Sequence, residues 1–386
     1  MLIFICGCTA EKDFSDITET LPTGVYENEQ IQTDDEFIGL WLPVYEIAPE
    51  KNSTEEEYKS RVSDMLEEIS KFGFTDIFVQ VRANCDSIYP SEYFSPCRQF
   101  TADRELMFDA LRIFADEAHR QKLKIHAWLN PYRVSSAGEC DRNNTVFGYI
   151  SSEDVTDGED WVYIKPSSAS GRKLILDGVR ELVTNYNLDG IHIDDYFYPT
   201  TDESFDRDDY ESYTSEGGKV SLDEWRRENV NTLIASIYAL IKNHKEELMF
   251  SISPCGDIDK NFNRLYADVE TWCRCPGFAD MIIPQIYYGF ENSAQPFEKC
   301  LDGWMKIKTE AEIRLVIGLA AYKAGEEDEY AGNGRHEWEK NDDILKRQVE
   351  LIRKKSLDGF ALFSYNYIFG NSYFKNNEII ALKEVI

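Results

Sequence analysis

The sequence is short of positive charge. Only 41 lysines and arginines stand against 71 aspartates and glutamates, which gives the 386-residue chain a net charge of −30. A field of this sign repels nucleic acid and anionic membrane surfaces. We therefore expect no nucleic-acid partner, and a neutral or cationic ligand fits the charge better.

The motifs of several common enzyme classes are also missing. No glycine-rich phosphate loop follows the first expected strand, where the chain reads LPVYEIAPEK, and this disfavours a doubly wound dinucleotide-binding sheet. No G-x-S-x-G elbow occurs and the five histidines are scattered, which disfavours a Ser-His-Asp hydrolase. We expect no cofactor.

Metal ligands at suitable spacing are scarce. Cys273 and Cys275 form a C-x-C without a second pair or nearby histidines, which is a weak metal signal. A set of His126, His192 and Asp194 is geometrically conceivable. Histidines inside a fold are more often satisfied by hydrogen bonds, so we predict no metal site.

Long apolar runs are missing beyond the first residues. The chain begins MLIFICGCTAEKDF, and its apolar run ends in a lipobox-like Ile5-Cys6-Gly7-Cys8. The run is short for a signal peptide and has no basic stretch before it. We interpret residues 1–10 as a truncated signal segment, with Cys8 as the lipidated residue of an exported cell-envelope lipoprotein. The alternative is a short apolar tail on a cytoplasmic protein. No other run reaches about 18 apolar residues, so we expect membrane attachment only through the lipid.

After this segment, residues 11–35 are acidic and without periodicity, which is typical of a flexible tether. From residue 36 short β-type runs alternate with longer amphipathic stretches. The β runs are FIGLWLPV, DIFVQVR, KIHAWLNP, GIHIDDY, MFSISP, MIIPQIYY, RLVIGLAAY and GFALFSY, and the helical patterns include Glu55–Phe72, Leu106–Gln121, Ala169–Tyr186, Leu222–Asn243 and Asp342–Lys355. Eight such pairs predict an α/β fold, a (β/α)8 TIM barrel, as a single domain over residues 36–386 with inserted loops.

Alternation along the strands predicts which side chains enter the barrel, because successive residues point to opposite faces. In the fourth strand Ile191 and Ile193 take the helix side, so His192 and Asp194 take the interior. The same split sends inward Trp41, Gln80, Arg82, His126, Trp128, Asn130, Ser251, Ser253, Gln285, Tyr287 and Tyr322. Burying unpaired polar groups costs about 1–3 kcal/mol each, and barrel cores are usually Val, Ile and Leu. This polar, aromatic interior predicts a wet mouth that holds a hydrogen-bonding ligand.

Two adjacent aspartates end the fourth strand in DGIHIDDYFYP. Asp194 faces inward at the carboxyl end of the strand, where barrel enzymes place catalytic groups. Asp195 is expected to point away from the axis or into the loop, with Arg226 or Arg227 as its partner. It then either takes part in the chemistry or anchors the loop through a salt bridge.

The stretch after these aspartates, Thr200–Val220, is acidic and rich in tyrosine and has no helical period. We predict a loop that covers part of the cleft, with Gly217-Gly218 as a hinge. Ser221 and Glu224 predict a capping box at the start of the following helix.

Nine stretches carry a resemblance to a known family: QVRANCDSIYPSEYFSP, HAWLNPYRV, DGIHIDDYFYP, WRRENVN, ISPCGDI, YADVETW, PQIYYGF, GLAAYKAG and FALFSY. In this order they resemble the motifs of glycosyl-hydrolase-like family 10, TIM-barrel proteins of the bacterial envelope related to the YngK-type lipoproteins. The resemblance runs from about Phe37 to the end of the chain. It implies hydrolysis of glycosidic bonds in cell-wall glycan or a similar polysaccharide, in a cleft lined by Arg82, Asn84, Asp86, Asn130, Arg133, Asp194, Asp195, Gln285 and Tyr287.

The fourth-strand motif is also distantly similar to the D-G-x-D-x-D-x-E pattern of glycoside hydrolase family 18 chitinases. Here His192 stands at the second aspartate, Asp194 at the third and Tyr196 where the acid glutamate belongs. Either a neighbouring carboxyl replaces that acid, or the protein binds glycan without cutting it.

Glycosidases usually work with two carboxyls. We take Asp194 as one, and Asp195, Asp86, Asp257 and Glu291 as candidates for the other. The leading hypothesis is an exported glycoside hydrolase acting on cell-wall glycan, with Asp194, Asp195 and Asp86 as catalytic residues. Trp41 and Trp128 are expected to be sugar platforms, and His192, Tyr196 and Tyr322 are expected to bind substrate. The alternatives are a non-catalytic glycan-binding lipoprotein and a metal-dependent deacetylase or amidase.

Overall fold

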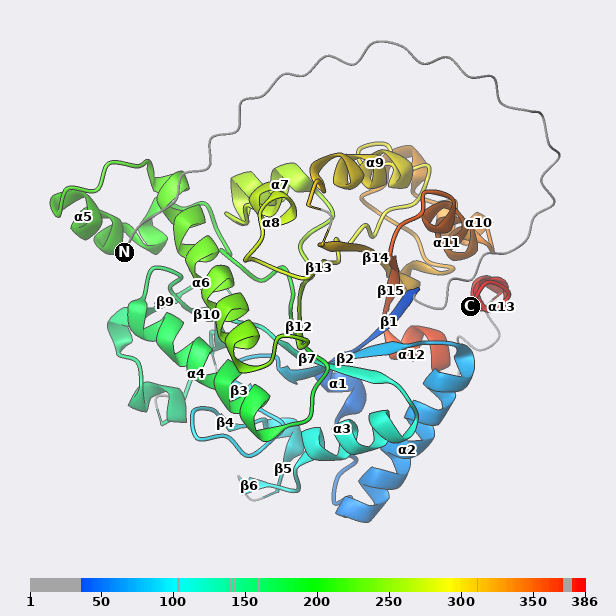
Figure 1. Cartoon of the computed structure of the whole chain (residues 1–386), viewed down its shortest axis with the longest axis horizontal. Coiled ribbons are helices and arrows are strands. Elements are labelled where there is room, and N and C mark those ends of the chain that lie inside the picture. Colours follow the sequence, from blue (N-terminus) through cyan, green and yellow to red (C-terminus); the bar gives the residue numbers. More distant parts are fainter. Residues whose placement is uncertain are drawn as a thin grey trace, which may run out of the picture. The chain divides into compact units, whose positions relative to one another are not determined.

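Eight parallel strands close into a barrel (Figure 1). In chain order they are β1 (Phe37–Leu42), β2 (Asp76–Arg82), β7 (Lys124–Leu129), β11 (Gly190–Ile193), β12 (Met249–Ile252), β13 (Met281–Ile282), β14 (Arg314–Ala320) and β15 (Gly359–Phe363). Neighbours around the barrel are neighbours in this order, and β15 closes on β1. The predicted TIM barrel is confirmed, and every strand lies within one of the predicted β runs.

This computed structural model describes residues 36–102, 105–138, 140–141, 143–158, 160–310, 312–370 and 377–386. Phe37–Ile386 forms one compact unit. The predicted signal segment with Cys8 and the predicted tether lie outside the described residues. Within the described ranges, no helix combines the length and the hydropathy needed to cross a membrane.

The helices surround the strands (Figure 1). The longer ones are α2 (Glu55–Phe72), α3 (Ala110–Arg120), α4 (Ala169–Asn185), α6 (Leu222–His244), α9 (Phe297–Ile307) and α11 (Ile344–Lys354), and the shorter ones include α1 (Val44–Ile47), α7 (Ile258–Arg264), α8 (Val269–Arg274), α10 (Glu337–Lys340), α12 (Tyr365–Phe369) and α13 (Asn377–Lys383). Only α3 departs clearly from its predicted start, because Leu106 pairs with Thr101 in a two-stranded ladder and Asp109 caps the helix.

Two insertions follow the carboxyl ends of β2 and β7. The first contains β3 (Asp86–Ser87), β4 (Ser95–Pro96), β5 (Thr101–Ala102) and β6 (Glu105–Leu106). The second is an antiparallel sheet of β8 (Arg133–Ser136), β9 (Val155–Asp157) and β10 (Trp161–Ile164), with β10 in the middle. Both insertions start at the end of the barrel where TIM-barrel enzymes bind substrate.

Packing divides the apolar side chains into two groups. Ile191 and Ile193 belong to the large cluster between the strands and the helices. A separate cluster fills the barrel interior and consists of Phe37, Trp41, Phe78, Trp128, Met281, Ile283, Val316 and Ala361. The predicted alternation of the fourth strand is therefore confirmed.

The segment 200–220 contains a helix, so the prediction of a non-helical loop is wrong. Glu203–Phe205 forms one turn of 3-10 helix and α5 covers Arg207–Ser215. The Tyr210 and Tyr213 rings lie 5.4 and 6.0 Å from the Trp225 ring of α6, measured between centroids. So short a helix depends on tertiary contacts more than on its own sequence pattern, which explains why the pattern did not reveal it.

Candidate active site

A cavity of about 940 Å³ lies at the carboxyl ends of the barrel strands. Most of the predicted site residues line it: Trp41, Gln80, Asn84, Asp86, Trp128, Asn130, Arg133, Asp194, Asp195, Tyr196, Gln285, Tyr287 and Tyr322. They lie in or after six different barrel strands and so meet only in the closed barrel. No residue of 200–220 is among the lining residues, so the predicted lid does not form part of the described cavity.

Asp194 is the most strongly perturbed carboxyl of this cavity. Its Oδ2 accepts a hydrogen bond from Trp128 Nε1 (3.0 Å). Its Oδ1 is buried and has no hydrogen-bond partner among the described residues. Burial, and then the charge of Asp195, raise the pKa of Asp194 well above its usual value, while the Trp128 bond and the Arg133 cation act in the opposite direction. Asp194 therefore keeps its proton to a higher pH than an ordinary aspartate does.

Asp195 lies beside Asp194 in the same cavity. Burial raises the pKa of Asp195, and the charge of Lys260 and a hydrogen bond from Gln285 partly offset this effect. Two adjacent carboxyls in unequal surroundings take up protons one after the other, so the pair carries one proton over a range of pH. One acidic and one ionised carboxyl in a single cavity are the groups that acid-base chemistry requires.

The predicted pairing of Asp195 with Arg226 or Arg227 is wrong. Arg226 is fully buried and forms its ion pair with Asp206 (2.5 Å). Arg227 pairs with Glu224 (2.9 Å), whose carboxylate therefore does not complete the predicted capping box, although Ser221 does cap α6. The unexpected turn before α5 brings Asp206 to Arg226 and leaves Asp195 to the cavity.

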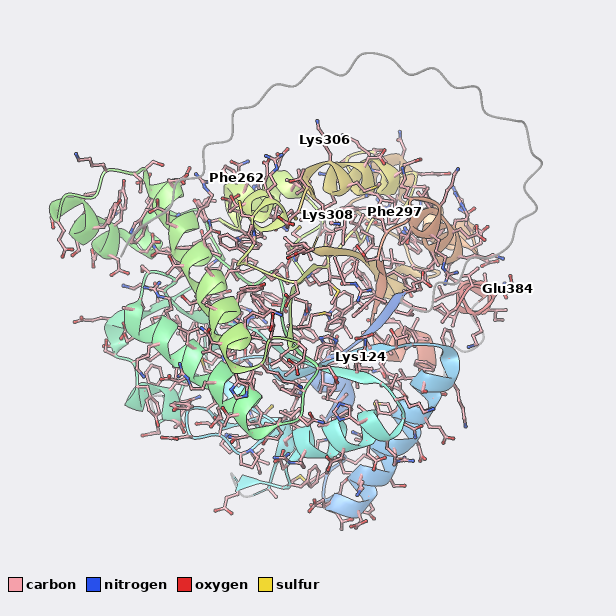
Figure 2. The ribbon with its side chains drawn as sticks, viewed as in Figure 1. Lys124, Phe262, Phe297, Lys306, Lys308 and Glu384 are labelled. Carbon is pink, nitrogen blue, oxygen red and sulfur yellow. The ribbon has the colours of Figure 1, made fainter. Side chains whose placement is uncertain are left out.

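Arg227 also lies away from the cavity, since its guanidinium stacks over the Phe262 ring of α7 at 4.0 Å. Figure 2 labels Phe262 near the α7 and α6 ribbons.

Asp86 places a third carboxyl at the cavity, in the insertion after β2. It accepts a hydrogen bond from the backbone N–H of Asn84 (3.2 Å) and another from the Cys97 thiol. Burial raises the pKa of Asp86. Cys97 itself lines the cavity and is a free cysteine.

Aromatic rings and buried polar atoms complete the lining. Trp41 and Trp128 are only 2% and 5% exposed, so they form its floor and belong equally to the interior core. Tyr196 is 41% exposed, and the Tyr287 and Tyr322 rings meet edge to face at 5.8 Å. In the part of the chain that the structure describes, Asn130 Oδ1 and Ser253 Oγ are buried without a hydrogen-bond partner. These groups suit a ligand with apolar faces and hydroxyl edges.

Comparison with known proteins identifies the family. Residues 38–333 match the family described as Glycosyl hydrolase-like 10. The chain belongs to this family.

Among the relatives of this glycosyl hydrolase-like protein, the glycosyl hydrolase YngK of Bacillus subtilis (strain 168) is 30% identical over 354 residues, which cover 83% of this chain and 68% of YngK. The glycosyl hydrolase DigH of Escherichia coli (strain K12) is 27% identical over 418 residues, covering 95% of this chain and 91% of DigH. The family predicted from the nine motifs is confirmed.

Solved structures show the same fold at low sequence identity. The glycoside hydrolase domain of PgaB (BpsB) from Bordetella bronchiseptica matches with a TM-score of 0.60 and 12% identity, over 90% of this chain and 99% of that one. The catalytic domain of β-amylase from Paenibacillus polymyxa matches with a TM-score of 0.61 and 10% identity, over 92% and 98%. The barrel is thus one that glycosidases use. The family match includes the three carboxyls of the cavity, and Phe363 is the one lining residue beyond it.

Arg82 was predicted to face the cavity, and it does not. The pairing of β2 with β7 shifts register between Gln80 and Arg82, so Arg82 lies opposite Leu129 instead of continuing the inward alternation. Its guanidinium stacks over the Phe94 ring at 3.7 Å. An irregularity of this kind turns the next side chain to the other face.

His192 points into the barrel as predicted but does not reach the cavity surface. It is fully buried, accepts a hydrogen bond from Trp41 Nε1 at Nε2 (3.1 Å) and lies 2.8 Å from Ser251 Oγ at Nδ1. Burial lowers the pKa of His192 well below its usual value, so the ring is neutral and Nδ1 donates to Ser251. Through this hydrogen bond His192 orients the Trp41 indole.

The remaining carboxyl candidates are not brought to the cavity. Asp257 caps α7 and accepts a hydrogen bond from Gln295 (2.8 Å), and the backbone of Glu291 is held by Glu337. His126 pairs with Asp76 at the first residue of β2 (2.8 Å). Within the described ranges, no group of three or more His, Cys, Asp and Glu residues has metal-binding geometry.

Sequence reasoning missed several lining residues, including Tyr45, Cys97, Arg98, Gln99, Trp161 and Phe363. Tyr45 and Phe363 lie at or just beyond the carboxyl ends of β1 and β15, and this position was a usable signal. Trp161 and Cys97 come from the insertions, whose folding back over the barrel has no periodic signature.

Proposed function

We propose that this protein is a glycoside hydrolase that cleaves O-glycosidic bonds in peptidoglycan glycan or a related polysaccharide. The observation that carries the proposal is Asp194, a buried carboxyl with one oxygen fixed by Trp128 and the other unpaired, beside Asp195 in the cavity. Membership of the glycosyl hydrolase-like family and the glycosidase-type barrel support it.

In the proposed reaction, protonated Asp194 donates its proton to the glycosidic oxygen as the bond from that oxygen to the anomeric carbon breaks. Ionised Asp195 faces the positive charge that develops on the sugar ring, and it acts either as nucleophile or as the base that activates water. Water adds to the anomeric carbon, and its proton restores the pair. Asp194 thereby takes the role of the acid glutamate, whose position in the family 18 pattern is occupied here by Tyr196.

The same cavity supports sugar binding. The rings of Tyr287 and Tyr322 offer surfaces for the C–H faces of pyranose rings. The buried Asn130 Oδ1 and Ser253 Oγ gain partners when sugar hydroxyls enter, which removes a desolvation cost of about 1–3 kcal/mol each.

We also propose that the protein is held at the cell envelope. A lipid on Cys8 and a tether over residues 11–35 would hold the barrel at the cell envelope. Replacing Cys8 by Ser should move the protein from the membrane fraction to the aqueous fraction. An unchanged distribution between the two fractions would contradict the lipid anchor while leaving the proposed reaction intact.

The experiment that tests the reaction uses purified glycan strands, with and without attached peptides, and separates the products by mass. Shortened glycans from the full chain, and none from Asp194→Asn, are expected. Binding without products would support the non-catalytic glycan-binding alternative. Release of acetate or peptide that a chelator abolishes would support the deacetylase or amidase alternative.

A further inference from the structure

One cation of the cavity, Arg133, is held by aromatic rings. Its guanidinium carbon lies 3.9 Å from the centre of the Tyr196 ring and 4.0 Å from the centre of the Trp161 ring. The rings come from separate segments, the end of β11 and the inserted strand β10. Rings attract a guanidinium through its flat face, so they leave its N–H edge as the part that forms hydrogen bonds.

No carboxylate among the described residues forms an ion pair with Arg133, which hydrogen-bonds the Tyr196 hydroxyl. Its Nε is buried without a partner among these residues, so the terminal nitrogens are the part of the guanidinium that a ligand can reach. Asp194 and Asp195 do not bond to Arg133, but both interact with its charge. This charge offsets part of the rise that burial causes in the pKa of each carboxyl. A positive charge that no carboxylate of the described residues pairs with therefore lines the cavity near both aspartates.

The overall charge of the chain makes this cation informative. With a net charge of −30, the protein repels anions in general, so an anionic group enters only where a local cation receives it. A planar carboxylate matches the planar N–H edge of a guanidinium, whereas a neutral hydroxyl gains less from it.

We propose that Arg133 selects glycans that carry a carboxylate substituent next to the bond that is cut. The carboxylate belongs either to an ether-linked acid on an amino sugar or to the ring of a uronic acid, and the chemistry of recognition is the same. This inference rests on the proposed function, because it places a sugar between Arg133 and the two aspartates.

The test measures binding of matched oligosaccharides to the full chain by calorimetric titration. One ligand carries the ether-linked carboxylate, a second is the same glycan with that carboxyl converted to its amide, and a uronic acid glycan with its own amide forms the second arm. The variants are Arg133→Met, which removes the charge but keeps an apolar stem, and Arg133→Lys, which keeps the charge but loses the planar edge. Arg112→Met is the control, because Arg112 also stacks on a ring (Tyr186, 4.5 Å) but lies on α3 outside the cavity.

The native chain is expected to bind a carboxylate form about tenfold or more tightly than its amide. Arg133→Met should bring this ratio close to one, Arg133→Lys should leave part of it, and Arg112→Met should retain it. Preference for either carboxylate supports the proposal and identifies where the group is placed on the sugar. Equal binding of acid and amide by the native chain, or an unchanged ratio in Arg133→Met, would overturn it.

Two further outcomes separate this inference from the proposed reaction. A carboxylate preference that depends on Arg133, in a protein that cuts no glycan, would uphold the selection and refute the hydrolase. Cleavage of acid and amide glycans at equal rates, with Arg133→Met changing only the pH profile, would limit Arg133 to tuning the aspartates and refute the selection.

Discussion

At the scale of single residues, the proposed reaction depends on the different surroundings of Asp194 and Asp195. Asp194 bonds to the Trp128 indole, and Asp195 interacts with Gln285 and feels the charge of Lys260. Because both carboxyls line the cavity, Asp194→Asn and Asp195→Asn should each slow glycan cleavage by about a hundredfold or more while the chain stays folded. Rates of product formation test this, with Asp116→Asn on the exposed side of α3 as a matched control. Full activity in Asp195→Asn would show that Asp195 has only a structural role.

The raised pKa of Asp194 also predicts a dependence of stability on pH. A folded-state pKa above the unfolded value means that the folded chain binds the proton more tightly, so Asp194 destabilises the fold increasingly as pH rises above about 4, the ordinary value for aspartate. Asp194→Asn should therefore melt at a higher temperature than the native chain at neutral pH, and the difference should disappear below about pH 4. Thermal melts across this range measure it, and equal melting temperatures at neutral pH would contradict the raised pKa.

Trp128 links the core to the chemistry. Its indole N–H lowers the pKa of Asp194, so Trp128→Phe should raise that pKa further and move the alkaline limb of the kcat/KM profile to higher pH. From the sequence we expected Trp128 to be a sugar platform. Because Trp128 is only 5% exposed and belongs to the interior cluster, we expect Trp128→Ala to lower the free energy of unfolding by about 3–5 kcal/mol. An alkaline limb in Trp128→Phe identical to that of the native chain would show that Asp194 is not the acid.

Much of the candidate site was predictable at this scale, because alternation in a strand fixes the direction of each side chain once its neighbours are known to be apolar. Ile191 and Ile193 fixed the inward direction of Asp194 in this way. Arg82 escaped the same argument because a register shift in β2 has no signature in DIFVQVR. The sequence also did not reveal that Asp195 interacts with Lys260 and Gln285, because these residues lie far from Asp195 along the chain.

At the scale of elements, Arg226 of α6 holds the segment that follows β11. It donates to the Asp206 carboxylate and to the backbone carbonyls of Thr201 and Asp202, entirely away from solvent. Loss of one partner leaves a buried charge uncompensated. Arg226→Met should therefore lower the free energy of unfolding by about 3–5 kcal/mol in urea titrations.

Arg227 is the matched control, because it neighbours Arg226 but pairs with the half-exposed Glu224. Arg227→Met should cost about 1 kcal/mol or less. If Arg226→Met is as mild, Asp206 must find another partner, and the segment is held by its ring contacts instead. Adding Asp206→Leu to Arg226→Met should recover much of the loss, since no charge then stays buried.

The elements themselves were predictable to different degrees. The barrel strands stand out because short runs rich in Ile, Val, Leu and Phe alternate with longer amphipathic stretches. The helix α5 was not recognisable in the sequence, because its stability comes from Tyr210 and Tyr213 packing on Trp225. The sheet β8-β10-β9 was missed for a similar reason, since its strands are short and pair only with one another.

At the scale of the whole molecule, one barrel gathers three carboxyls, two arginines and a set of aromatic rings at one end. Their residues are spread from β1 to β15, so only closure of the barrel brings them together. The fold followed from the alternation of β runs with amphipathic stretches, and the family followed from nine motifs in order. The identity of the glycan did not, because it depends on side-chain geometry in the insertions.

Cleavage of glycan in water enriched in heavy oxygen is the sharpest test of hydrolysis with Asp194 as the acid. Hydrolysis requires that each new reducing end take its oxygen from the solvent. From the native chain we expect shortened glycan strands with one heavy oxygen atom at every new reducing end, and from Asp194→Asn we expect intact strands. Products without heavy oxygen, or strands cut equally by Asp194→Asn, would contradict it.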